Sequence, residues 1–149
     1  MNIQLRVLDE RIGRDWPLPA IQTAGSAGMD LRACLNAPFD LQPNQTEMIS
    51  TGLAMHIADP GYAAVILARS GQAMRGLVMG NQIGLIDSDY QGELRVLCWN
   101  RSDAVIRIEP GERIAQLVVL RVVVPQFSLV DEFAPTERGT NGFGSTGTS

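Results

Sequence analysis

Short apolar runs, separated by residues that favour turns, recur along almost the whole chain of 149 residues. They are rich in the branched and aromatic side chains that favour β-strands. The runs lie at 3–8, 46–58, 62–69, 76–80, 93–100, 104–108, 114–124 and 126–130. Proline, glycine, asparagine or aspartate interrupts them at 43–44, 59–61, 80–84, 100–103, 109–111 and 125. Only 70–75 looks able to form a short helix. The pattern predicts an almost all-β fold, either a sandwich or a barrel.

The composition fits one globular domain and argues against a general nucleic-acid binder. A chain of this length can bury about 70% of its unfolded surface in one core. The formal net charge is −4, whereas nucleic-acid binding normally requires a basic face. All 12 basic residues are arginines, which excludes a Walker A phosphate loop and Schiff-base chemistry on lysine. Local arginines would therefore have to bind any anionic ligand.

Cysteine and histidine are too few and too scattered for a zinc cluster. We interpret Cys34 and Cys98 as reduced core thiols, and His56 as an ordinary residue of an alternating strand. A histidine-dependent triad would have to use His56, which has no supporting motif. The first residues alternate like a strand instead of forming a signal peptide, and no run reaches 18 apolar residues. We expect a cytoplasmic protein without a membrane segment.

Residues 84–93 place two carboxylates and a tyrosine between glycines, where two apolar runs meet. The flanking runs predict a β-hairpin. Its glycines permit positive φ and close approach of a ligand, and Asp87 and Asp89 could attract a cation or orient a water molecule. A solvated acidic hairpin tip also fits. An EF-hand calcium loop does not fit, because its twelfth position is Cys98 and the sequence that follows is strand-like.

The last third of the chain has two unusual segments. The run 114–124 is apolar on both faces for most of its length, so it is either a subunit interface or a strand central to the core. From residue 131 the composition changes, and we predict a β domain over 1–130 and a flexible arm over 131–149. The arm is either a frayed end or a segment that wraps an anion with backbone N–H groups.

Two further candidate sites are ARSG at 68–71 and GERIAQ at 111–116. The first offers a charge, a hydroxyl and backbone amides to a phosphate. Together with the acidic turn they belong to a series of motifs: AGMDL at 27–31, ARSG at 68–71, Asn81 with GLIDSDYQG at 81–92, GERIAQ at 111–116 and RGTNGFGSTG at 138–147. In kind and order these motifs resemble the trimeric all-β dUTPase family of bacterial type, the dUTP nucleotidohydrolases. The resemblance covers essentially the whole chain.

The resemblance implies a distorted, jelly-roll-like β-barrel that hydrolyses dUTP to dUMP and pyrophosphate. This reaction would limit uracil in DNA and supply dUMP for thymidylate synthesis. Asp87 matches the carboxylate that activates the water attacking the α-phosphorus, and Tyr90 would lie against the deoxyribose and exclude a 2′-hydroxyl. The residues that would read uracil, largely through the backbone, are Asn81, Leu85, Ile86 and Arg95. Those that would hold the phosphates are Arg69, Ser70, Gly71 and Gln116. The arm residues that would close over the γ-phosphate and uracil are Arg138, Phe143, Gly144, Ser145 and Thr146.

The resemblance also implies a cofactor and a partner. Mg²⁺ would bind chiefly through the triphosphate and waters, with Asp30 as a candidate for ordering those waters and no direct protein ligand. The partner would be the chain itself, in a homotrimer whose sites combine motifs from three subunits; neither nucleic acid nor a membrane is expected. Two alternatives stay open: a dCTP deaminase of the same superfamily, which usually carries Arg-Ser-Ser, and a catalytically silent β-barrel that binds nucleotides for regulation.

Overall fold

The computed structural model describes residues 1–140 and shows the all-β protein that the sequence predicts. Within these residues there are ten strands and one short helix. In chain order they are β1 (Gln4–Val7), β2 (Met29–Arg32), β3 (Phe39–Leu41), β4 (Thr46–His56), β5 (Tyr62–Ala68), α1 (Ser70–Met74), β6 (Leu77–Met79), β7 (Ile83–Ile86), β8 (Glu93–Asn100), β9 (Ile106–Ile108) and β10 (Arg113–Arg121). The helix predicted at 70–75 is confirmed by α1. No helix in this part of the chain is long and apolar enough to cross a membrane.

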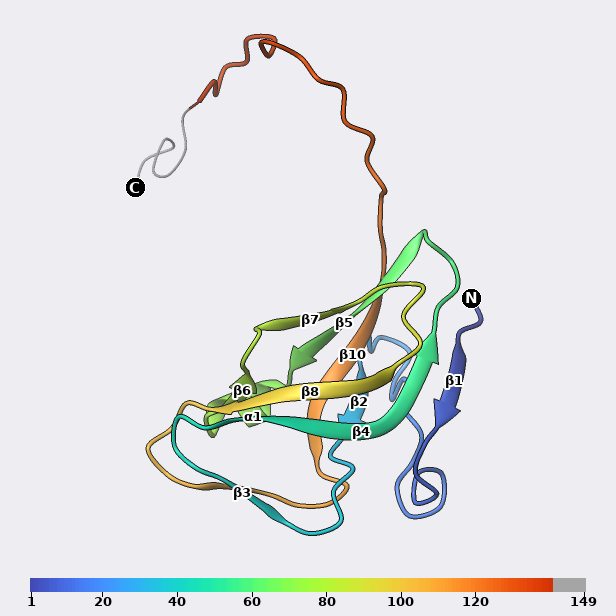
Figure 1. Ribbon diagram of the computed structural model, residues 1–149, viewed down its shortest axis with the longest axis vertical. Helices are drawn as coiled ribbons and strands as arrows, with labels where there is room; N and C mark the ends of the chain where they lie inside the picture. The colour runs from blue at the N-terminus through green and yellow to red at the C-terminus, as the bar shows by residue number, and fades with distance from the viewer. Residues whose placement is uncertain (141–149) are drawn as a thin grey trace.

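The strands form two four-stranded sheets and one two-stranded sheet (Figure 1). The strand order is β1-β4-β8-β6 in the first sheet and β2-β10-β5-β7 in the second, while β3 pairs with β9. Every neighbouring pair is antiparallel. The second sheet matters most for the site, because its strands carry parts of four of the five motifs.

Strand β8 illustrates why the chain forms half-buried strands. Leu94, Val96 and Cys98 are 0 to 1% exposed and point into the core, whereas Arg95 and Trp99, at alternate positions, are exposed. This alternation is the period of a strand with one face on a core. Each large apolar side chain buried in this way contributes roughly 1.5–3 kcal/mol. Other large, fully buried side chains are Leu31, Leu41, Ile49, Ile66, Leu77 and Ile108.

Asn100, the last residue of β8, is a polar residue with no exposed surface. Its Nδ2 donates to the backbone oxygens of Leu41, at 2.9 Å, and Ala104, at 2.8 Å. Its Oδ1 accepts hydrogen bonds from the backbone N–H and the hydroxyl of Ser102. A buried amide that is satisfied in this way holds together backbone segments that have no strand pairing with one another.

The structure departs from the sequence-based strands in two directions. Strands β2, β3 and β7 are additional; they are short, and β7 contains Gly84, which weakens a strand pattern. The run 114–124 ends as a strand at Arg121, because its partner β5 begins at Tyr62, directly opposite. The strand predicted at 126–130 is wrong. No strand lies beside this segment in residues 1–140, and an unpaired strand leaves its backbone groups without partners.

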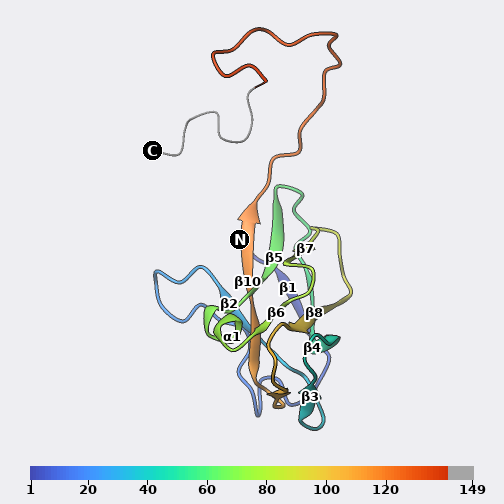
Figure 2. The same cartoon turned by 90° about the vertical axis from the view of Figure 1, so that its left-hand side faces the viewer.

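Beyond β10, residues 122–140 leave the sheets as an extended segment (Figures 1 and 2). Large apolar side chains along it are almost fully exposed, including Val123 at 91%, Phe127 at 89% and Leu129 at 99%. Soluble proteins seldom expose so many large apolar groups in succession without a partner that covers them.

Candidate active site

Three of the five motifs meet on the second sheet. Asp30 on β2 lies opposite Gln116 on β10, and Gln116 lies opposite Leu67 on β5. Nε2 of Gln116 donates to the backbone oxygen of Ala68 at 3.0 Å, next to Arg69. The register of β10 with its two neighbours therefore joins AGMDL, ARSG and GERIAQ, which are far apart in the sequence.

Gly28 in the first motif makes room for Gln116. A Cβ atom at Gly28 would lie 2.7 Å from Oε1 of Gln116, well inside van der Waals contact. A larger residue would displace the amide from its bond to Ala68. The glycine of AGMDL is thus explained by packing against the fourth motif.

The Asp30 carboxylate lies between two arginines. Its Oδ1 is 2.7 Å from Nε of Arg69, and its Oδ2 is 3.2 Å from Nη1 of Arg113. A guanidinium has five N–H donors, so Arg69 keeps further donors for an anion when one of them faces Asp30. The pairing holds Arg69 over the sheet in one orientation, which suits a phosphate-binding group.

Two residues that the sequence analysis did not single out help to build this cluster. The first is Arg113, described above. The second is Gln72 in α1, which is 8% exposed and whose Nε2 donates to the backbone oxygen of Arg113 at 2.7 Å and to Oε1 of Glu112 at 2.9 Å. The same carboxylate oxygen accepts a bond from Nη2 of Arg75 at 2.7 Å. These bonds fix α1, the helix that follows Arg69, against the start of β10. No sequence motif predicts this contact.

The acidic turn lies between β7 and β8. Its expected flanks do pair, since β6 and β8 are antiparallel neighbours, but β7 lies between them in the chain and pairs with β5 in the other sheet. The turn is therefore a crossing between two sheets rather than a simple hairpin tip. Asp87, Ser88 and Asp89 line an open groove together with Tyr62 and Val122. Both carboxylates are exposed there.

Tyr90 is held close to the backbone of the turn. Its hydroxyl donates to the backbone oxygen of Glu93 at 3.0 Å, and its backbone N–H donates to the oxygen of Asp87 at 3.2 Å. A Cβ atom at Gly92 would lie 2.4 Å from the Tyr90 hydroxyl oxygen. Only glycine at this position lets the ring fold back over the turn, which explains the second glycine of the motif.

The residues expected to read uracil lie on free strand edges. Leu85 and Ile86 are on β7, which has β5 on one side and no strand of residues 1–140 on the other. Arg95 is on β8, which pairs with β6 only from Cys98 to Asn100, so the edge of β8 at Arg95 has no β6 residue beside it. Asn81 lies in the short connection between β6 and β7. Unpaired edges present backbone N–H and C=O groups that can bind a polar base edge.

The acidic turn and the Arg69 cluster are far apart within one chain. Ile86 lies opposite Ala64, and Asp87 follows Ile86 in the direction away from Arg69. The five residues of extended chain from Ala64 to Arg69 span roughly 17 Å. A single chain therefore brings together Asp30, Arg69 and Gln116, but it does not bring Asp87 or Tyr90 to them.

The arm residues are described only in part. Arg138 lies in the exposed segment that leaves the sheets, while Phe143, Gly144, Ser145 and Thr146 lie outside the described residues. Ser70 and Gly71 are exposed at the start of α1, beside Arg69, as the sequence predicts for a phosphate site.

The surroundings of the two cysteine thiols and of His56 fit structural rather than catalytic residues. Burial raises the pKa of the Cys98 thiol to about 12, and burial likewise raises the pKa of the Cys34 thiol. Both thiols are therefore protonated at neutral pH, which makes them poor nucleophiles. His56 lies at the end of β4, with Nδ1 3.3 Å from Oε1 of Gln4.

Comparison with known proteins decides the family. The dUTPase family profile matches residues 14–147. The deoxyuridine 5′-triphosphate nucleotidohydrolase of Idiomarina loihiensis is 60% identical over 149 residues, 99% of each chain, and that of Psychromonas ingrahamii is 58% identical over 98% of this chain and 97% of its own. The chain belongs to the dUTPase family. The solved dUTPase of Staphylococcus bacteriophage 80alpha with dUPNHPP has a TM-score of 0.85 at 28% identity, over 98% of both chains.

As a dUTPase, the protein hydrolyses dUTP to dUMP and pyrophosphate, as its motifs implied. The dCTP deaminase alternative is not favoured, because the matching family and the named relatives are dUTPases. The silent regulatory barrel is not favoured for the same reason.

A site that binds a metal ion through protein side chains alone brings several acidic or other metal-ligating groups together. Residues 1–140 contain no group of three or more His, Cys, Asp or Glu side chains that could hold one. A solved mutant dUTPase from phage phi11 of S. aureus, 26% identical with a TM-score of 0.74, coordinates a structural Mg(II) ion.

Proposed function

We propose that each active site of this dUTPase is assembled from three copies of the chain. One copy supplies Asp30, Arg69 and Gln116, a second supplies the acidic turn, and a third supplies the arm, residues 131–149. The observation that carries this proposal is the separation of roughly 17 Å or more between Arg69 and Asp87 along β5. Catalysis requires the water-activating group and the phosphate-binding groups around the same phosphorus atom.

Exposed apolar surface supports a homotrimer. Near the end of strand β10, Leu120 is 45% exposed, and the segment after the strand exposes Val123, Val124 and Phe127 at 74 to 91%. A neighbouring subunit would cover these side chains and would explain why the run 114–124 is apolar on both faces.

In the proposed reaction, Asp87 takes a proton from a water molecule while the water oxygen attacks the α-phosphorus. A new P–O bond forms, the bond from the α-phosphorus to the bridging oxygen of the β-phosphate breaks, and pyrophosphate leaves. A positioned general base of this kind contributes about 10²–10⁴-fold to the rate. No covalent enzyme intermediate is needed.

The phosphates would be bound by Arg69, Ser70, Gly71 and Gln116. Asp30 orients Arg69 through the 2.7 Å contact, so that the remaining guanidinium donors face the substrate. Mg²⁺ fits as an ion carried by the triphosphate, because it keeps several waters and takes phosphate oxygens as ligands. When bound, it would neutralise charge on those oxygens. Both Asp30 oxygens face arginines, so Asp30 would reach the ion through water.

The nucleoside would be recognised by the turn. Tyr90 would lie against the deoxyribose and leave no space for a 2′-hydroxyl. The free edges at Leu85, Ile86 and Arg95, with Asn81, would bind the polar edge of uracil.

The arm would close the site. Arg138, Ser145 and Thr146 would contact the γ-phosphate, and Phe143 and Gly144 would cover uracil. Closure would exclude bulk water and fix the triphosphate for in-line attack. A cytoplasmic location also stays a prediction.

Subunit mixing tests the shared site directly. We expect Asp87→Asn and Arg69→Gln chains to be nearly inactive alone, and to regain activity when they are unfolded and refolded together. In random mixed trimers about a quarter of the sites would combine an intact Arg69 from one chain with an intact Asp87 from its neighbour.

The control mixes Asp87→Asn chains with chains that carry both substitutions, which cannot create an intact site. If the first mixture shows no more activity than this control, the site lies within one chain and the proposal is wrong.

A further inference from the structure

Glu93 is the residue that Tyr90 uses as an anchor. The Tyr90 hydroxyl donates to the backbone oxygen of Glu93 at 3.0 Å, and Gly92 lets the ring lie over the turn between them. The position of the ring therefore depends on where the backbone of residue 93 is held. That residue is the first of β8 and lies opposite Ala54 on β4.

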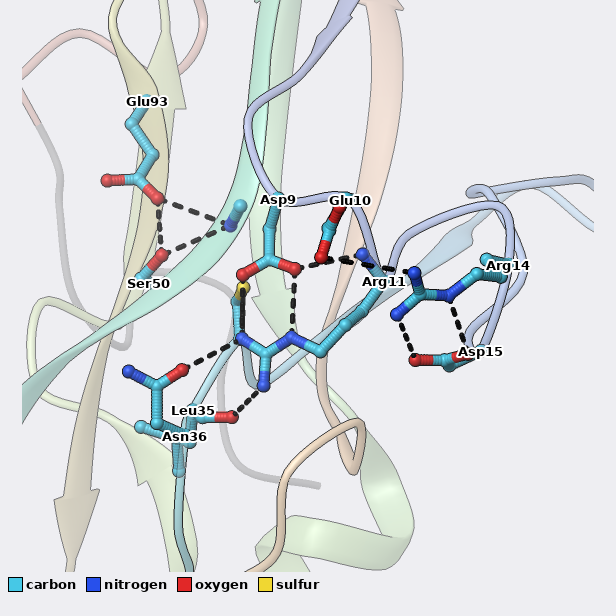
Figure 3. A network of polar contacts seen from close by, with 11 residues as sticks. Asp9, Glu10, Arg11, Arg14, Asp15, Leu35, Asn36, Ser50 and Glu93 are labelled. Atoms are coloured by element: carbon cyan, nitrogen blue, oxygen red, sulfur yellow. Dashed lines mark hydrogen bonds and ion pairs between the residues drawn. The ribbon is translucent and has the colours of Figure 1, made fainter.

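The Glu93 side chain is bound by donors from β4 and β8, and Figure 3 shows its bond to Ser50 on β4. Its Oε1 accepts a hydrogen bond from Oγ of Ser50 and one from the backbone N–H of Gly52 at 3.2 Å. Its Oε2 accepts a bond from Nε of Arg95 at 3.0 Å. Burial would raise the pKa of this carboxyl, but the donors outweigh burial, and the pKa lies below its usual value. The carboxylate is therefore charged and fixed at neutral pH.

The other end of this anchor is rigid. The pairing of β4 with β8 shifts register between Ser50 and Ala54, which marks an irregularity of the bulge type. Gly52 lies within it at φ +66°, and a Cβ atom there would lie 2.8 Å from Sγ of Cys34. Its backbone oxygen accepts a bond from the N–H of Leu8 at 2.8 Å. Glu93 thus ties the turn to a packed part of the β domain rather than to a mobile loop.

Arg11, drawn in Figure 3, joins the chain segments around Gly52 through an ion pair and hydrogen bonds. Arg11 pairs with Asp9 at 2.6 Å and donates to the backbone oxygen of Leu35 at 2.8 Å. The pKa of Asp9 lies well below its usual range because the Arg11 side chain binds the carboxylate. Cys34, whose thiol fills the space that a side chain at Gly52 would need, also belongs to this network, because Nη2 of Arg11 lies 3.6 Å from its Sγ.

We propose that Glu93 is a specificity-determining positioning residue, which holds Tyr90 in the place where the ring excludes ribonucleotides. The inference rests on the proposed role of Tyr90 as the sugar-excluding residue. The carboxylate does not touch the substrate; it fixes the β-strand backbone whose carbonyl binds the tyrosine hydroxyl. Without it, the Ser50 hydroxyl loses its acceptor, the Gly52 N–H keeps only Oγ of Ser50 at 3.1 Å, and the ring gains freedom to make space for a 2′-hydroxyl.

The test compares kcat/KM for dUTP and UTP, because their ratio reports the position of the ring more directly than total activity does. We expect Glu93→Ala to lower the dUTP/UTP ratio by about tenfold, since steric exclusion of one hydroxyl is worth up to about a hundredfold. The kcat for dUTP should change much less, because Asp87 is untouched. Glu93→Gln keeps an acceptor for Ser50 and Gly52 and should restore most of the ratio.

Glu109→Ala is the matched control. Glu109 also binds the Nε of an arginine two residues away, Arg107 at 2.8 Å, but it follows β9, outside the turn. We expect it to leave the dUTP/UTP ratio unchanged. Thermal unfolding and native mass of every variant show that the comparison is made on folded protein.

A double-substitution cycle separates positioning from general loosening. Tyr90→Phe removes the hydroxyl that binds residue 93, so Glu93→Ala should lower the ratio little further in that background. A full additional loss in the double variant would overturn the proposal, as would an unchanged ratio in Glu93→Ala. Tyr90→Ala reports on the underlying role: if it leaves the ratio unchanged, both the role of Tyr90 and this inference are wrong. If Tyr90→Ala lowers the ratio and Glu93→Ala does not, only the inference about Glu93 is wrong.

Discussion

Asp87 and Glu93 are carboxylates at the two ends of the same turn, with opposite surroundings. Glu93 is held by Ser50, Gly52 and Arg95, whereas Asp87 is exposed on the wall of an open groove. A carboxylate that accepts several hydrogen bonds is a poor base, because those bonds stabilise its charged form. The residue-level environment therefore favours Asp87 as the group that takes a proton from water, and Glu93 as an anchor.

Replacement of Asp87 tests that assignment. We expect Asp87→Asn to lower kcat by about 10²–10⁴-fold, because asparagine cannot accept the proton. The affinity for dUTP should change little, since the amide keeps the size of the side chain. Rapid measurement of pyrophosphate release gives kcat, and calorimetry with a non-hydrolysable dUTP analogue gives the Kd.

Asp89→Asn is the matched control, since Asp89 lines the same groove and has the same exposed character. We expect near-normal turnover in that variant. Normal turnover in Asp87→Asn would show that another group activates the water.

At the scale of elements, two central strands do most of the positioning. Strand β10 lies between β2 and β5 and so aligns three motifs, and β8 carries Glu93 and Arg95 at one end and Asn100 at the other. The long strands were predictable, because their alternation or apolar length is strong in the sequence. The short strands β2, β3 and β7 were not, because Asp30, Asp40 and Gly84 interrupt their apolar pattern with residue types that are depleted in strands.

Asn100 gives a stability prediction for these elements. We expect Asn100→Ala to lower the free energy of unfolding by about 2–4 kcal/mol, because it removes the donor to the buried backbone oxygen of Leu41 and the acceptor of the Ser102 backbone N–H. Urea unfolding at a fixed protein concentration measures the change, since an oligomer's stability depends on concentration.

The control is Asn36→Ala. Asn36 is exposed, and its Oδ1 accepts one bond from Arg11 at 3.2 Å. Its loss should cost less than about 1 kcal/mol. Equal losses in the two variants would mean that the buried network at Asn100 has no special weight.

At the scale of the whole molecule, the described chain has a well-packed interior, but part of its surface is apolar and exposed and its active-site residues are separated. The segment after β10 exposes Phe127 and Leu129 almost completely, and the acidic turn faces a groove without the phosphate-binding cluster. A homotrimer would cover the exposed apolar side chains and would bring a phosphate-binding cluster to the acidic turn. Native mass spectrometry measures the number of subunits directly.

Removal of residues 136–149 tests the arm. We expect the shortened protein to keep its fold and its number of subunits, because this segment contributes no strand and no core side chain within the described residues. Its kcat/KM for dUTP should fall by at least about a hundredfold, because the site can no longer exclude water or fix the triphosphate.

Removal of residues 148–149 alone, beyond the RGTNGFGSTG motif, is the control and should leave activity nearly intact. An unchanged rate after the longer deletion would remove the arm from the mechanism. A smaller number of subunits, read from the native mass and the mass of the shortened chain, would instead show that the arm is needed for assembly.

The sequence by itself determined the all-β class, the short helix and the set of motifs that place the chain in the dUTPase family. These features depend on local periodicity and on residue types at fixed spacing, both of which can be read directly from the sequence. The tertiary structure decided how those motifs are arranged. Register across β2, β10 and β5 joined Asp30, Gln116 and Arg69, while the direction of β7 carried Asp87 to the far end of β5. Strand pairing between distant segments sets these distances, and no local pattern encodes which strands become neighbours.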